Sequence, residues 1–153
     1  MSAIRLPLVL GEDTADAGWR ARLAPDIDVR PLYWDGDPAA ARAALEEILA
    51  DWPADRPYVL AGLADAARAV PELAAGAARG PGRVLLCPSG ELADPPAEPV
   101  DAAVTVLWPR DVPDGAALTW KAAARGEFAV RLVEPEGFPW TPPVFTVRDE
   151  LRV

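Results

Sequence analysis

The sequence contains no histidine, and its only serines are Ser2 and Ser89. Histidine is the side chain that most often transfers protons near neutral pH. A Ser-His-Asp hydrolytic site therefore cannot be assembled from this chain. For proton transfer, a carboxyl group is the side chain that remains.

Cysteine is almost absent as well, because Cys87 is the only one. A single cysteine excludes an internal disulfide and favours a reducing cytoplasm as the compartment. The carboxylates show no metal-ligand spacing, so we expect neither a metal nor a cofactor. The apolar run of residues 6–10 is too short for a signal peptide, and no run approaches the length of a membrane span. We therefore expect a cytoplasmic protein that does not enter membranes.

Positive charge is in deficit. The chain has 15 Lys and Arg against 24 Asp and Glu, which gives a formal charge of −9 and a pI of about 4.5. Such a field repels nucleic acid and anionic membrane surfaces. Small molecules and proteins are the partner classes that remain.

Apolar residues are abundant, at 51% of the 153 residues, and they predict one folded domain over residues 1–153. Apolar runs alternate with helical patterns along the whole chain. Strands are predicted at residues 4–10, 27–34, 58–63, 83–87, 103–108 and 128–133. Helices are predicted at residues 16–23, 39–52, 65–79, 115–125 and 144–153. This alternation predicts a three-layer α/β domain with a mainly parallel sheet of about six strands.

Local signals fix two of the expected boundaries. Gly11 is predicted to end the first strand, and residues 35–38 form a turn with Pro38 near the first position of a helix. In a parallel sheet with right-handed crossovers, the carboxyl ends of the strands lie along one edge. We expect any functional site at that edge.

Two stretches carry a resemblance to a known family. Residues 58–67, YVLAGLADAA, stand at a strand-to-helix turn, where α/β-hydrolases have the nucleophile elbow G-x-S-x-G. Residues 104–111, VTVLWPRD, then Trp120 and then residues 126–133, GEFAVRLV, resemble the C-terminal part of type II thioesterases from polyketide and nonribosomal peptide pathways. In that family the next turn has roughly the sequence G-G-H-F. In this chain the corresponding residues 136–140 are EGFPW. The resemblance implies a reduced α/β-hydrolase core.

The family's catalytic residues can be compared one by one with the matching positions of this chain. Gly62 matches the elbow glycine, Ala64 stands at the serine position and Ala66 at the second glycine. Asp111 falls on the family's acid or one residue from it, and nothing replaces the histidine. Residues 88–101 look too short for the family's helical lid. The resemblance therefore implies a scaffold without the acyl-enzyme mechanism, although an oxyanion hole made of backbone N–H groups could persist.

Three further side chains have two interpretations each. Asp65 is an elbow nucleophile in a shifted register, or a first-turn carboxylate stabilised by the helix dipole, which we favour. Asp111, beside Arg110, is a catalytic acid or base if its pKa is raised, or an ordinary loop carboxylate. Cys87 is a reactive thiol at a strand end, or a small buried hydrophobe, which we favour.

The chain has six tryptophans, and Trp34, Trp108 and Trp140 fall at or just past predicted strand ends. They could line a binding pocket, form a protein–protein surface or cap the core of the sheet. An exposed apolar surface of this kind would also suit a homodimer. The residues expected to line a cleft are Leu63, Ala64, Trp108, Arg110, Phe138 and Trp140.

Two functional hypotheses follow. The first is a pseudoenzyme: a non-hydrolytic, thioesterase-like accessory protein of natural-product biosynthesis that binds a hydrophobic intermediate or a biosynthetic protein partner. The second is a repurposed enzyme, such as a cyclase, isomerase or dehydratase, that acts through a shaped apolar cleft and the carboxylate of Asp111.

Overall fold

The structure of the chain is a computed structural model. The residues described are 8–12, 29–33, 36–52, 54, 57–63, 67–76, 80–88, 100, 102–109, 120, 122 and 127–133. The predicted helices at residues 16–23 and 144–153 lie outside these residues, as does almost all of the connection at residues 88–101.

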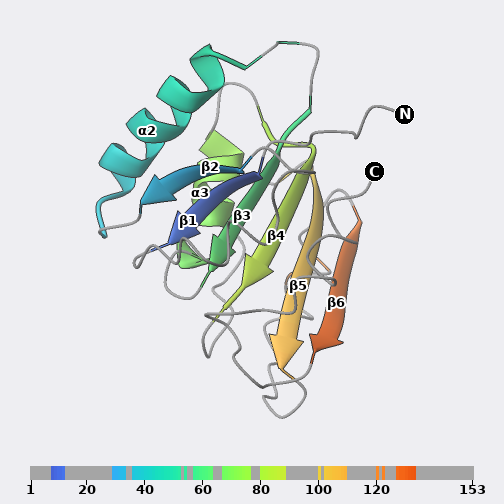
Figure 1. Cartoon of the computed structure of the whole chain (residues 1–153). Coiled ribbons are helices and arrows are strands. Elements are labelled where there is room, and N and C mark those ends of the chain that lie inside the picture. The colour runs from blue at the N-terminus through green and yellow to red at the C-terminus, as the bar shows by residue number, and fades with distance from the viewer. Residues whose placement is uncertain are drawn as a thin grey trace.

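Six strands form one sheet in the order β2-β1-β3-β4-β5-β6, and every pairing between neighbours is parallel (Figure 1). This confirms the expected sheet. The strands are β1 Leu8–Glu12, β2 Val29–Tyr33, β3 Val59–Leu63, β4 Arg83–Cys87, β5 Ala103–Pro109 and β6 Phe128–Val133.

The strand order reverses once, at β1. The chain passes from β1 to β2 on one side and then returns to place β3 on the other side of β1. The prediction that Gly11 ends the first strand is wrong, because β1 continues through Gly11 to Glu12. Gly11 is paired with Leu32 of β2 on one side and with Gly62 of β3 on the other. A strand held by ladders on both sides continues through a glycine that would weaken an isolated strand.

Helix α2, Pro38–Ala50, follows β2 and begins as its sequence predicts. Asp37 is the N-cap, and its side chain accepts a hydrogen bond of 3.0 Å from the backbone N–H of Ala39. Pro38 occupies the first helical position, where its missing N–H costs nothing. Gly36 has a φ of 97°, so the tight turn before the cap requires a residue without a Cβ.

Helix α3, Val70–Gly76, is shorter than the predicted helix of residues 65–79. Ala67 and Arg68 form a 3₁₀ turn, and the α-helix begins only at Val70. The reason is Pro71, which has no N–H to continue a helix from residue 65 but fits the first turn of a new one. In the described part of the chain, no helix is long and apolar enough to cross a membrane.

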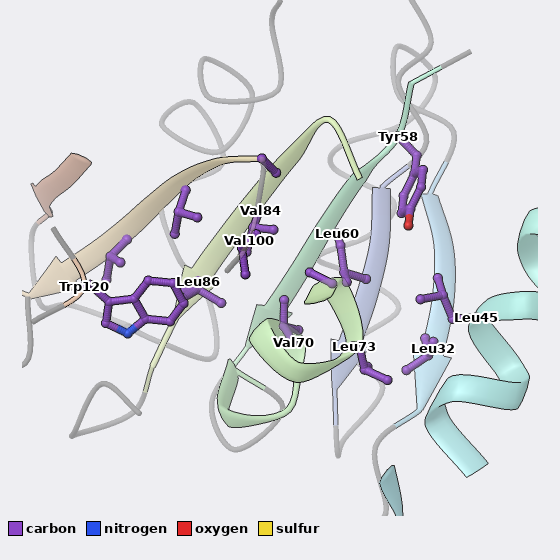
Figure 2. Packing of buried hydrophobic residues seen from close by; sticks show 14 of the residues in the cluster. Leu32, Leu45, Tyr58, Leu60, Val70, Leu73, Val84, Leu86, Val100 and Trp120 are labelled. Carbon is purple, nitrogen blue, oxygen red and sulfur yellow. The ribbon is translucent and has the colours of Figure 1, made fainter. Parts of the chain in front are cut away.

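The two helices pack on one face of the sheet and create the main hydrophobic core (Figure 2). Leu45 of α2 lies near Leu32 of β2, and Val70 and Leu73 of α3 lie over the middle of the sheet. At the far end of this core, the indole of Trp120 stacks on the ring of Phe128, with ring centroids 5.8 Å apart and planes inclined by 8°.

The opposite face of the sheet is also buried at three of its strands, β3, β4 and β5. Because side chains alternate along a strand, Val84 and Leu86 of β4 face the helices while Leu85 and Cys87 face the other way, and all four are buried. A parallel sheet buried on both faces is the middle layer of a three-layer α/β structure. This agrees with the fold class predicted from the sequence.

The cap of α2 can be tested directly. Replacing Asp37 with Ala removes the acceptor for the Ala39 N–H, so we expect the free energy of unfolding to fall by about 1 kcal/mol. Urea unfolding followed by circular dichroism measures this change. Asp51→Ala, at the other end of the same helix, is the matched control and should change stability by much less. Equal losses in the two variants would contradict the capping role.

Candidate functional site

The carboxyl ends of all six strands lie along one edge of the sheet because every pairing is parallel (Figure 1). Open parallel sheets bind ligands outside this edge, at the point where the strand order reverses. Here that point lies between β1 and β3. Gly11 and Gly62 are paired with each other there, so neither strand carries a side chain at this level. Glycines placed in this way allow a ligand or another segment to approach the backbone closely.

Strand β3 leads directly to the predicted elbow. Gly62 is buried within β3, and the strand ends at Leu63, whose backbone is paired with Cys87 of β4. Ala64 is the next residue of the sequence. The strand end therefore falls where the G-x-S-x-G comparison requires, one residue before the position that a serine would occupy. In this chain that position carries only a methyl group.

Cys87 ends β4, where its backbone is paired with Leu63, and its side chain is fully buried. Burial raises the pKa of the Cys87 thiol far above its ordinary value, because a thiolate would lose its hydration there. The thiol is therefore neutral at physiological pH, and a neutral thiol is a poor nucleophile. These observations agree with the interpretation of Cys87 as a small buried hydrophobe.

The three tryptophans that the structure describes are all buried. Trp108, near the end of β5, is 5% exposed and belongs to the core cluster on the helical face. Trp120 stacks on Phe128, and Trp52 lies at the end of α2 with the Arg30 guanidinium 6.0 Å from the centre of its ring. Of the three interpretations of the aromatic residues, core packing fits these positions. A binding role for Trp108 stays a prediction.

Most of the other predicted site residues lie outside the described part of the chain. Two of them can still be placed along the sequence, because Arg110 and Asp111 directly follow the last residue of β5. Leu63 is described as a residue of β3, without its side chain. The remaining predicted site residues outside the described part are Ala64, Asp65, Phe138 and Trp140.

Comparison with known proteins supports the fold. No family model and no curated protein sequence matches the chain. Among solved structures, RedJ, with a polyethylene glycol molecule bound in its active site, superposes with a TM-score of 0.70 at 14% identity, covering 97% of this chain and 94% of that chain. The thioesterase domain SrfTE, linked to the cyclization of the lipopeptide antibiotic surfactin, gives 0.69 at 10% identity, covering 97% and 92%.

ClbQ, from the colibactin NRPS/PKS pathway, is a third similar structure, with a TM-score of 0.60 at 12% identity over 85% of this chain and 87% of that chain. The chain shares the α/β fold, with its parallel sheet, of these three solved structures. In α/β-hydrolases a strand-to-helix turn carries the nucleophile elbow, and one N–H of the oxyanion hole comes from another loop. Backbone N–H groups are supplied by residues of any kind, so the loss of a side chain does not by itself remove such a hole.

One feature of the site was missed by the sequence analysis. Gly11, predicted as the end of a strand, is instead the neighbour of Gly62 across the switch point. The available signal was a glycine near the end of each of two apolar runs. That signal could not place the two residues side by side, because the pairing of β1 with β3 skips β2 in sequence.

The burial of Cys87 generates a chemical prediction. We expect iodoacetamide at mildly alkaline pH to alkylate the folded protein at least about tenfold more slowly than the unfolded protein, because the buried thiol has a raised pKa and no access to solvent. Mass spectrometry of timed samples, with and without urea, measures both rates. Cys87→Ala is the control and should take up no label. Rapid alkylation of the folded chain would restore the reactive interpretation.

Proposed function

We propose that this protein is a non-hydrolytic, thioesterase-like accessory protein of natural-product biosynthesis that works in the cytoplasm. Its role is to bind a hydrophobic intermediate, or the biosynthetic partner that carries one, at the carboxyl edge of the sheet. One observation supports the proposal most. The chain forms a parallel sheet whose strand β3 leads to the expected elbow, yet the elbow position holds Ala64 and the chain has no histidine.

The missing groups are those that acyl transfer cannot do without. A serine nucleophile supplies the oxygen that attacks the thioester, and an imidazole takes its proton and returns it to the leaving group. A methyl group at the elbow can do neither. Binding is different, because it requires a shaped site, apolar contact and a few hydrogen-bond donors. The retained scaffold is thus suited to holding a molecule that it does not cleave.

The class of ligand follows from charge and from the comparison. With a net charge of −9, the protein's long-range field disfavours polyanions but does not oppose the approach of a neutral ligand. In RedJ, which shares this fold, the active site accommodates polyethylene glycol, an uncharged linear chain. We therefore propose a neutral, extended and largely apolar chain as the ligand, such as the acyl portion of a polyketide or lipopeptide intermediate.

The absence of hydrolysis is the first test. With a medium-chain acyl thioester of N-acetylcysteamine, release of free thiol should stay at the rate of a protein-free control. Ala64→Ser should behave in the same way, because a serine without a base is not activated. A continuous thiol assay measures both proteins. Thioester cleavage by the wild-type protein that survives repurification would contradict the proposal.

Binding and turnover separate the accessory role from the repurposed enzyme. Calorimetry with the same thioester should show binding by the wild-type protein, and Trp140→Ala should weaken it by about tenfold through lost apolar contact. Trp140→Phe should retain most of the affinity.

Mass spectrometry of candidate pathway intermediates after incubation should show no conversion. Conversion that is abolished in Asp111→Asn and retained in the control Asp51→Asn would identify the enzyme instead. Absence of binding for every thioester and carrier-linked intermediate would contradict both functions.

A further inference from the structure

We propose that the edge of β6 that faces away from β5 is a homodimer interface, at which the β6 strands of two copies pair antiparallel about a two-fold axis. This inference concerns a surface away from the elbow and does not depend on the proposed function. It rests on the exposure of β6, on the direction of its backbone groups and on the charges that one register brings together.

Among the strands that the structure describes, β6 is the last of the sheet, and two of its apolar side chains are exposed. Phe128 is half-buried against Trp120, but Val130 is 41% exposed and Leu132 is 60% exposed. These three residues alternate along the strand and share one face. They form an apolar stripe along β6 that is half-buried at Phe128 and increasingly exposed toward Leu132. An edge strand of this kind is a template for pairing with another strand unless it is protected.

The hydrogen bonding to β5 identifies which backbone groups are turned away from the sheet. The N–H of Val104 donates to the carbonyl of Glu127 over 2.7 Å, and Val104 is paired with Phe128. Residues 127, 129 and 131 therefore direct their backbone groups toward β5. Residues 128, 130 and 132 direct theirs outward. These are the groups that a second strand would pair with, as in recognition by strand addition.

Two-fold symmetry leaves three central registers, and charge distinguishes them. If Arg131 lies on the two-fold axis, the guanidinium groups of the two copies face each other. If Val130 lies on the axis, Arg131 of each copy faces Ala129 of the other. Centring the pair on Ala129 sets Glu127 of each copy opposite Arg131 of the other, and Phe128 opposite Val130. Opposite charges in directly facing positions stabilise a strand pair, whereas like charges destabilise it. We therefore assign the register centred on Ala129.

This register also satisfies the backbone. Phe128 and Val130 then form hydrogen-bonded pairs, and Ala129 faces its own copy in a non-hydrogen-bonded pair on the axis. The guanidinium of Arg131 has five N–H donors, so it can donate hydrogen bonds to a carboxylate of the second copy in addition to its interaction within the chain. Such an interface is isologous, so it closes as a dimer and does not grow into a fibre.

Charge reversal tests the register. We expect the full-length protein to be a dimer by light scattering and sedimentation, dissociating on dilution. Arg131→Glu should raise the dissociation constant by about tenfold or more, because two attractive pairs become repulsive. Glu127→Arg should have the same effect, and the double variant Glu127→Arg with Arg131→Glu should restore the dimer. Circular dichroism confirms that each variant is folded.

Cross-linking supplies an independent test. In a non-hydrogen-bonded antiparallel pair the two Cα atoms are about 4.5 Å apart, which a disulfide can bridge. Ala129→Cys should therefore form a disulfide-linked dimer on mild oxidation, whereas Arg131→Cys, displaced from the axis, should not. Cys87 does not interfere, because it is buried. A protein that is monomeric at every concentration overturns the proposal. A dimer that Arg131→Glu leaves intact and Ala129→Cys does not cross-link also overturns it.

Discussion

The parallel pairing of β1 with both β2 and β3 is the constraint on which the rest of this structure depends. Parallel strands can be joined only by crossover connections, which cover the faces of the sheet. Both faces of β3, β4 and β5 are buried, and the interiors of these strands hold almost no polar side chains. Thr105 is the one buried polar side chain among the described residues. Functional groups are thereby confined to the ends of the strands.

The strand ends of this chain are chemically sparse. Thioesterase-like α/β-hydrolase folds normally combine a backbone scaffold with a nucleophile and a base at this edge. Here Ala64 follows β3, Cys87 is a neutral buried thiol, and imidazole is absent from the chain. The scaffold and the catalytic groups are separable, because the former depends on apolar strands and glycines and the latter on a few side chains. A protein that keeps only the scaffold can retain binding after losing bond cleavage.

The same parallel order explains why β6 differs from the strands beside it. Val106 and Leu107 of β5 are completely buried, since β5 has neighbours on both sides and layers on both faces. Within the described residues, β6 is paired with a strand on one side only, and its apolar residues become more exposed from Phe128 toward Leu132. An open sheet always has two such edges. A second copy is the simplest way to cover one of them, because it brings its own complementary strand.

Features set by neighbouring residues could be predicted from the sequence. These include the turn at residues 35–38 with Pro38 near the first helical position, and the bounds of β4 and β6, which the structure reproduces at both ends. The start of α3 was missed because residues 65–79 were read as one alanine-rich helix in spite of Pro71, although a proline fits only the first turn of a helix.

The absence of histidine from the chain and of serine from position 64 was also visible in the sequence, because it concerns residue types alone. What only the tertiary structure decided is which distant segments become neighbours. Gly11 beside Gly62, Trp108 inside the core and the exposure of β6 all depend on strand order and register. Those are set by the simultaneous burial of both faces of the sheet, a condition that no single stretch of sequence contains.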